Sequence, residues 1–248
     1  MNLGTKMKVL ALAFALAFAV QPAHAVLQVA IDIGGGPVFT CADGQACDTN
    51  PLIGVLQIGD MTIDGVVLNG SIQASTHGPD VLNTSSLIIR NTNPFAVSGE
   101  AVISDTDYFG NIHEIALSGA GTWALASGST TTNRWFADAL NGQGGGPGLL
   151  TPGTLLDSFA DTAVGAADSY SHDGLTPFSA SGPFSMTEQV DLTLTAGASL
   201  VNRGQTMTAV PEPPTWGLLV IGFAALGLGA LTRRNVRGEP KCRMSEGF

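Results

Sequence analysis

The chain has 248 residues, 20 of them acidic and ten basic, so its formal net charge at pH 7 is −10. An acidic chain of this kind repels phosphate groups, which makes nucleic acid and anionic lipid poor partners. Its 32 glycines and 13 prolines favour many tight turns over long helices.

Residues 1–25 are typical of a secretory signal peptide. Two lysines precede an apolar run over residues 9–20, and Ala23 and Ala25 form an A-x-A cleavage site. The alternative is an uncleaved membrane helix, but the apolar run is much shorter than the roughly 20 residues that a bilayer requires. We therefore predict export through the inner membrane and cleavage after Ala25.

The exported domain is expected to comprise residues 26–209, which is long enough for one sizeable core. Three basic residues face 17 acidic ones in this range, a net charge of −14. The simplest interpretation is that the charge keeps an exported domain soluble. Cations or uncharged sugars remain as alternative partners.

Cys41 and Cys47 are separated by five residues that include Asp43-Gly44. In an oxidising compartment this spacing predicts a small disulfide loop. A metal site is the alternative, but two thiolates do not complete a tetrahedral zinc shell and no histidine lies nearby in sequence.

Alternating apolar and polar residues predict an all-β domain of nine or ten strands. Hairpin turns are expected at Asp64-Gly65 and Asn69-Gly70, because both dipeptides lie between apolar β-formers. The expected strands cover residues 29–33, 86–90, 95–104, 112–117, 121–126 and 184–195.

Short helices are conceivable at residues 134–140 and 155–164, and the rest of residues 141–181 is typical of long loops because it is rich in Gly, Pro, Ser and Asp. Strands without a short sequence repeat favour a two-sheet sandwich over a β-helix. A jelly roll is one form of such a sandwich.

Catalytic motifs are absent from the sequence. No G-x-S-x-G occurs, and His113-Glu114 lacks the second histidine of H-E-x-x-H. A Ser-His-Asp group built on His172 and Asp173 has no motif behind it, and the glutamates of the exported domain are dispersed at positions 100, 114 and 188. We therefore predict a protein that is not an enzyme and has no cofactor.

Asp105 and Asp107 form the best candidate metal site. Two aspartates two residues apart, followed by Gly110, offer oxygen ligands to calcium at a turn. The segment is not an EF-hand, because Phe109 and Ala116 occupy positions where that loop requires ligands. An ordinary Asx-rich turn is the alternative.

Three aromatic residues are candidates for a sugar-stacking surface. Trp123 lies in an alternating strand and is expected in the core, whereas Trp135, beside Arg134 and Phe136, is the better candidate for exposure. Tyr108 completes the set.

The C-terminal region predicts one transmembrane helix at about residues 214–232. Residues 216–231 carry no charge, and Arg233, Arg234 and Arg237 follow, which places the polar tail 238–248 in the cytoplasm. Pro211 and Pro213 flank Glu212 and predict an extended, exposed peptide outside the membrane.

Residues 210–237 resemble the PEP-CTERM sorting signal, also described as an ice-binding protein C-terminal domain. The resemblance rests on Val210-Pro211-Glu212-Pro213, then one apolar span, then Arg233 and Arg234. It implies that an exosortase, a membrane transpeptidase, removes the tail and passes the protein to the cell envelope or the exopolysaccharide matrix. An ordinary anchor that is never cleaved is the alternative.

Two function classes follow from the sequence. The first is a non-enzymatic exported protein, sorted by exosortase, with a structural or adhesive role in the envelope or matrix. The second is a secreted carbohydrate-binding or polysaccharide-hydrolysing domain whose site is assembled from dispersed acidic residues.

Overall fold

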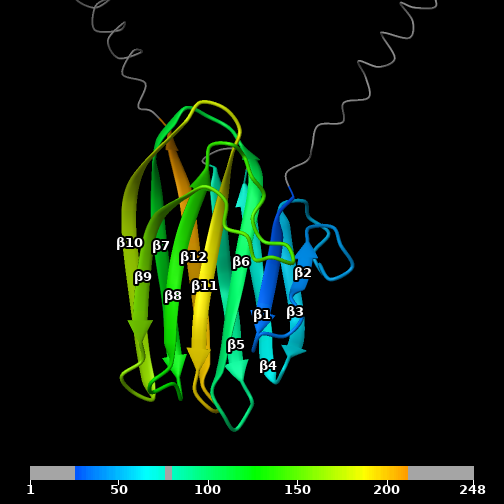
Figure 1. Ribbon diagram of the computed structural model, residues 1–248, viewed down its shortest axis with the longest axis vertical. Helices are drawn as coiled ribbons and strands as arrows, with labels where there is room; N and C mark the ends of the chain where they lie inside the picture. Colours follow the sequence, from blue (N-terminus) through cyan, green and yellow to red (C-terminus); the bar gives the residue numbers. More distant parts are fainter. Residues whose placement is uncertain (1–25, 76–79, 212–248) are drawn as a thin grey trace, which may run out of the picture. The chain divides into compact units, whose positions relative to one another are not determined.

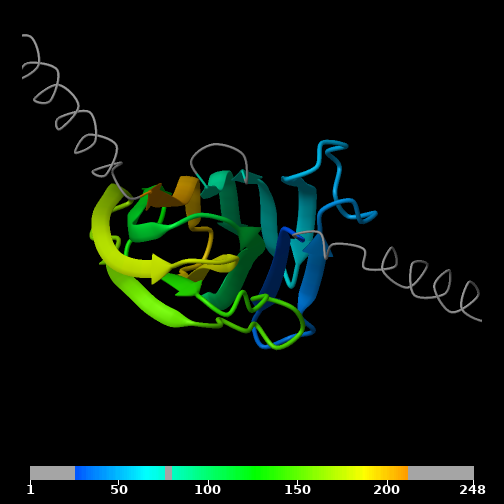
Figure 2. The same ribbon diagram turned by 90° about the horizontal axis from the view of Figure 1, so that it is seen from above.

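Two six-stranded antiparallel sheets pack face to face in the computed structural model, which describes residues 26–75 and 80–211 (Figures 1 and 2). The predicted signal peptide with Ala23 and Ala25 lies outside the described residues, as does the predicted membrane helix with Glu212, Pro213, Arg233 and Arg234. No helix in the described part of the chain has the length and apolar character needed to span a membrane.

The strand order in the first sheet, called sheet A here, is β2-β1-β6-β11-β8-β9. Its strands are β1 (Gln28–Ile33), β2 (Phe39–Ala42), β6 (Val97–Tyr108), β8 (Thr130–Asp138), β9 (Thr154–Thr162) and β11 (Phe184–Leu194). The order in the second sheet, called sheet B, is β10-β7-β12-β5-β4-β3. Its strands are β3 (Val55–Ile63), β4 (Val66–Ser75), β5 (Val81–Asn91), β7 (Ile112–Ala124), β10 (Ala167–Ala180) and β12 (Ser199–Pro211).

The core lies between the sheets and follows the alternation of the strands. In β11, Val190, Leu192 and Leu194 are buried, while the residues between them face outward and are half-buried. Successive side chains of a strand point to opposite faces, so each strand contributes one apolar row to the core. The predicted all-β two-sheet sandwich is confirmed.

Of the two predicted hairpin turns, one is confirmed and one is wrong. Asp64 and Gly65 have φ of 46° and 76° and join β3 to β4. Asn69 and Gly70 instead lie inside β4, which pairs with β3 on one side and β5 on the other. The register shift between Asn69 and Ser71 shows that the strand absorbs Gly70 as an irregularity rather than turning.

The two short helices considered for residues 134–140 and 155–164 are wrong. β8 and β9 occupy these segments, and burial along β8 alternates strictly between partly buried and buried residues. Residues 141–181 also contain β10, so the described part of the chain has twelve strands. Pairing with neighbouring strands outweighs the weak local preference of these segments.

The domain extends two residues beyond the boundary predicted at Ala209. Val210 and Pro211 belong to β12, where Val210 pairs with Glu114 and Pro211 with Ile112. The first two residues of the proposed sorting motif are thus part of sheet B, and Pro211 is exposed.

The core also contains a buried polar cluster that connects the sheets. The Thr84 hydroxyl donates to Glu188 Oε2, and Arg203 Nη2 donates to Asn133 Oδ1 over 3.3 Å. Glu188 and Arg203 are completely buried. Burial raises the pKa of Glu188 to about 7, although the hydrogen bond from Thr84 and the charge of Arg203 act in the opposite direction.

Candidate functional site

The outer face of sheet A carries a row of carboxylates. Asp32 of β1 is paired with Glu100 of β6, and Glu100 is paired with Asp191 of β11. Asp191 is paired in turn with Thr132 of β8. Side chains opposite one another on antiparallel strands lie about 5 Å apart at Cβ. Three acidic groups from three strands are therefore brought together on one rigid surface.

Next to the carboxylate row lies a row of hydroxyl side chains, two residues along the strands on the same face. Ser98 is paired with Thr193, and Thr193 with Thr130. The hydroxyls of Ser98 and Thr193 are 2.9 Å apart and hydrogen-bonded. Hydroxyl groups both donate and accept hydrogen bonds, so this row complements the acceptor-only carboxylates beside it.

Hydrogen bonds hold the carboxylates in place. Arg134 Nη1 forms an ion pair with Asp191 Oδ2, and Gln189 Nε2 donates to Glu100 Oε1 over 2.8 Å. Partial burial and the negative charges of Asp191 and Asp32 raise the pKa of Glu100, against the hydrogen bond from Gln189 and the charge of Arg134. Oδ1 of Asp32 is buried and has no hydrogen-bond partner within the described residues.

The carboxylate row and the hydroxyl row line an open groove of about 460 Å³. Gly34 and Gly35, in the connection after β1, form one border, with φ of 68° and 73°. No aromatic side chain is among the described residues that line the groove. The groove thus offers hydrogen-bonding groups to a ligand and has no ring for stacking.

The connection between β8 and β9 crosses the outer side of sheet A near β6 and β1 (Figure 1). Gly144 N donates to Ser104 Oγ over 3.0 Å, and Gln28 Nε2 donates to the Gly144 carbonyl. A Cβ at Gly144 would lie 2.7 Å from Thr187 Oγ1 and 3.0 Å from the Leu150 carbonyl oxygen. Only glycine allows the loop to lie this close to the sheet, and the loop limits the groove to the uncovered part of the face.

Asp105 and Asp107 face different surroundings. Asp105 points into the core, where burial raises its pKa to about 6 against the hydrogen bonds from Thr106 and Tyr108. Asp107, at φ 61°, accepts a hydrogen bond of 2.6 Å from Asn141 Nδ2. The described residues contain no group of three or more His, Cys, Asp or Glu side chains placed to hold a metal ion. The calcium hypothesis stays a prediction, to be checked by the melting temperature with and without calcium.

The predicted sugar-stacking surface does not form. Trp123, Trp135 and Tyr108 are each completely buried. Trp123 Nε1 donates to Asp161 over 2.8 Å, and Trp135 lies over Gly119, where a Cβ would be 3.1 Å from its ring. The prediction that Trp123 lies in the core is confirmed, and the prediction that Trp135 is exposed is wrong because Trp135 is on the inner face of β8.

His172 is paired with a different acid from the one considered. Its Nε2 lies 2.8 Å from Asp157 Oδ2, between β10 and β9, rather than contacting the neighbouring Asp173. The imidazole stacks against Phe159, with centroids 4.7 Å apart, and against Trp135 at 5.7 Å. These contacts join the edge strands of the two sheets and give His172 a structural role.

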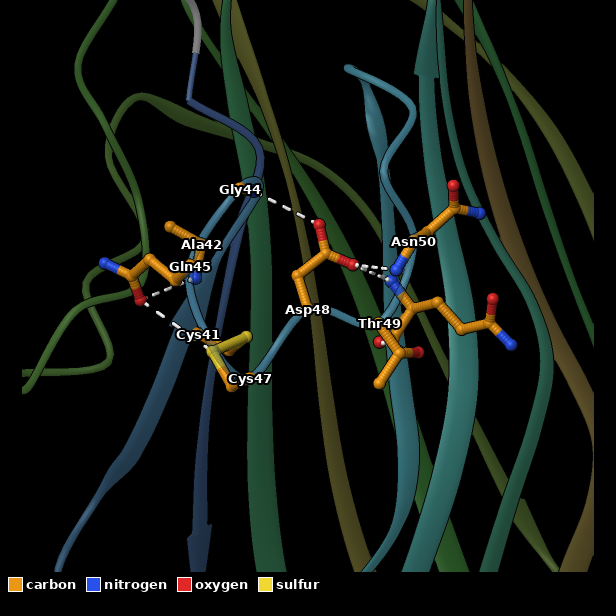
Figure 3. Close-up of a disulfide and its surroundings, with 9 residues drawn as sticks. Cys41, Ala42, Gly44, Gln45, Cys47, Asp48, Thr49 and Asn50 are labelled. Atoms are coloured by element: carbon orange, nitrogen blue, oxygen red, sulfur yellow. Dashed lines mark hydrogen bonds between the residues drawn. A yellow bond between two sulfur atoms is a disulfide. The ribbon is translucent and has the colours of Figure 1, made fainter.

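Cys41 and Cys47 form a disulfide, the pairing expected from their spacing (Figure 3). The carboxylate of Asp48 organises the loop that follows, accepting hydrogen bonds of 2.9 to 3.1 Å from the backbone N–H groups of Gly44, Asn50 and Gln57. Partial burial opposes these bonds, but together they lower the pKa of Asp48. The loop is therefore cross-linked both covalently and by hydrogen bonds.

Sequence reasoning missed the carboxylate row. The sequence shows Glu100 only as a dispersed acid, and Asp32 and Asp191 lie within the expected strands 29–33 and 184–195 without any motif. What the sequence does indicate is that each of these three residues occupies an outward-facing position of a strand. Their alignment depends on the register between strands far apart in the sequence, which alternation does not specify.

No protein-family model matches the sequence, and the comparison with curated proteins finds no match. Solved structures with similarity include TmCBM61 in complex with beta-1,4-galactotriose, at 10% identity and a TM-score of 0.30, over 64% of this chain and 90% of that chain. Another is the carbohydrate-binding module of Cellvibrio mixtus lichenase 5A in complex with cellotriose, at 12% identity and a TM-score of 0.25, over 62% of this chain and 95% of that one.

A third is the enzymatically active domain of Bacteriophage CBA120 tailspike protein 4, at 12% identity and a TM-score of 0.29. The match covers 60% of this chain and 20% of the tailspike domain. Identities and TM-scores of this size say nothing about what this chain binds, so the functional argument rests on the groove itself.

Proposed function

We propose that the exported domain is a non-catalytic polysaccharide-binding module that uses the groove on sheet A. The observation that carries the proposal is the row of Asp32, Glu100 and Asp191 beside a row of hydroxyls in one open groove. Carboxylates accept hydrogen bonds from sugar hydroxyls, and the lining hydroxyls of Ser98, Thr130 and Thr193 can both donate and accept them. Rigid strands hold these groups, so binding costs little ordering entropy.

The expected ligand is a neutral polysaccharide bound over several sugar units. The excess of carboxylates would repel a uronic-acid polymer. Without an aromatic ring among its described lining, the groove depends on hydrogen bonds that replace those to water, so each sugar unit adds little affinity.

We further propose that the strand order is that of a jelly roll.

Calorimetric titration with neutral oligosaccharides and with uronic-acid oligosaccharides tests the proposal. Asp191→Ala should weaken binding of the neutral ligand at least about tenfold, because it removes an acceptor and frees Arg134. Asp60→Asn, on the edge strand β3 of the other sheet, is the matched control and should leave affinity unchanged. Equal affinities of the two variants would contradict the groove as the site.

A second candidate function is polysaccharide hydrolysis. Its support is that Glu100 has a raised pKa beside Asp191, and a carboxylic acid next to a carboxylate is the usual pair for glycoside cleavage. A reducing-sugar assay on the polysaccharides that bind would test it. Turnover that disappears in Glu100→Gln, with the melting temperature retained, would replace the binding module by an enzyme.

We also propose that the chain is exported and sorted by exosortase to the envelope or exopolysaccharide matrix, where the domain acts as a structural or adhesive component. The support is the sequence: the signal peptide, Val210 to Pro213, the uncharged span and the arginines. A module that binds polysaccharide would suit that destination.

A further inference from the structure

Four large apolar side chains are exposed at one end of the sandwich. The exposed fractions are 95% for Ile53, 90% for Leu140, 64% for Leu52 and 63% for Phe109. Exposing such side chains is unfavourable in water, and clusters of them mark interaction surfaces. The set is called the apolar tips below.

The apolar tips lie in connections at the end of the strands where the described chain finishes, as the strand pairings show. Pro211 pairs with Ile112, which closes the turn containing Phe109. Asp107 N donates to Asn141 Oδ1 over 2.9 Å, which brings Leu140 to the same turn. The loop with Leu52 and Ile53 joins this end through a hydrogen bond of 2.8 Å from Ala74 N to the Gly54 carbonyl.

Hydrogen bonds hold each loop that carries an apolar tip. Asn50 Oδ1 accepts from Leu52 N over 3.0 Å, and Asp43 Oδ2 accepts from Gly54 N over 2.6 Å, next to the disulfide loop. Asp138 accepts from the N–H groups of Leu140 and Gly142 over 2.9 and 3.0 Å. Side chains held outward by ordered loops lose little entropy on contact with a partner.

The chain that continues from Pro211 indicates which partner this is. Only residues 212–215 separate Pro211 from Trp216, where the apolar part of the uncharged run begins. Four residues span at most about 14 Å when fully extended. If the uncharged run crosses a membrane, as the sequence predicts, this end of the sandwich faces the bilayer at short range.

We propose that the apolar tips insert into the lipid bilayer that the C-terminal segment enters, so that the domain rests on the membrane by this end. The inference depends on the proposed membrane span and is independent of the groove. The expected lipid is zwitterionic, because Asp43, Asp48, Asp107 and Asp138 lie behind the tips and would be repelled by anionic headgroups.

Fluorescence quenching in reconstituted liposomes tests the proposal. The full chain carrying Cys242→Ser is given one new cysteine, Ile53→Cys or Leu140→Cys, and labelled with an environment-sensitive dye. It is then reconstituted in phosphatidylcholine liposomes that contain a nitroxide-labelled lipid. Both positions should shift to shorter emission wavelength and be quenched at least about twofold, because the dye enters the apolar region.

Val164→Cys is the matched control. Val164 is 86% exposed and lies in the β9–β10 connection at the opposite end of the sandwich. Its label should remain unquenched. Quenching at Val164 equal to that at Ile53, or no quenching at Ile53 and Leu140, would overturn the proposal. Failure of the protein to float with the liposomes would also overturn the proposal. A shift of both labels to shorter emission wavelength without lipid would overturn it too, because self-association of the protein would then cover the two positions.

Discussion

Glu188 and Arg203 are ionisable residues in a core that is otherwise mostly apolar. Neither side chain has any exposed surface, and Glu188 Oε1 and Arg203 Nη1 have no hydrogen-bond partner within the described residues. Removing a charged group from water is unfavourable unless it is well paired. The free energy of unfolding should therefore depend on the protonation state of Glu188.

The Glu188→Gln variant should gain stability relative to the wild type as the pH rises from 5 to 8. The pKa of Glu188 is about 7 in the folded protein and near the ordinary 4.5 when unfolded. The folded state thus binds the proton more tightly than the unfolded state does. Protonation of Glu188 therefore contributes to the free energy of unfolding, and this contribution is fully present below about pH 4.5 and is lost as the pH rises through 7.

Denaturant unfolding at several pH values measures this effect. The stability difference between wild type and Glu188→Gln should shift toward the variant across that interval, most steeply between the two pKa values, and level off above pH 7. The buried Asp105, with a pKa of about 6, gives the stability of both proteins a pH dependence of the same sign at slightly lower pH, and this effect cancels in their difference. A stability difference that does not change with pH would show that Glu188 keeps an ordinary pKa.

Among the elements, the β8–β9 connection packs against sheet A at Gly144. Gly144→Ala should destabilise the protein by about 1 to 3 kcal/mol, because its Cβ would collide with Thr187 Oγ1 and the Leu150 carbonyl oxygen. Gly148→Ala is the matched control in the same loop, since its Cβ would meet Leu150 side-chain atoms at 3.6 Å, an ordinary contact. Thermal unfolding of both variants checks the prediction, which equal melting temperatures would contradict.

The disulfide loop is the second element with a clear energetic role. Replacing Cys41 and Cys47 together by serine should cost about 2 kcal/mol, since closing a loop this short removes only a modest chain entropy from the unfolded state. The measurement is denaturant unfolding of the oxidised wild type and the double variant. If the stabilities agree, the hydrogen bonds around Asp48 suffice to hold the loop.

At the scale of the whole molecule, the proposed export and sorting predict two cleavages. Intact-mass analysis of the native protein should give a mature form that begins at Val26 and ends near Pro211, because the predicted signals flank the described sandwich. β12 extends to Pro211, so we expect cleavage beyond the paired part of the strand. A mass that still reaches Phe248 would indicate an uncleaved anchor, and the proposed matrix role would lose its main support.

The architecture was largely predictable from the sequence because strand alternation is a local property. The period of two in residues 29–33 and 184–195 identified strands with one buried face, and Asp64-Gly65 identified a hairpin. The Cys41–Cys47 pairing also follows from local spacing. The expected export and sorting signals depend on charge, apolar length and short motifs, which are read directly from the sequence.

The site was decided by tertiary structure alone. The groove exists because Asp32, Glu100 and Asp191 are aligned across strands about 70 to 90 positions apart in sequence, and only strand order and register align them. The same non-local pairing turned two possible helices into β8 and β9 and placed Trp135 in the core. Local patterns specify which face of a strand a residue occupies, whereas its neighbours on that face depend on contacts between distant segments.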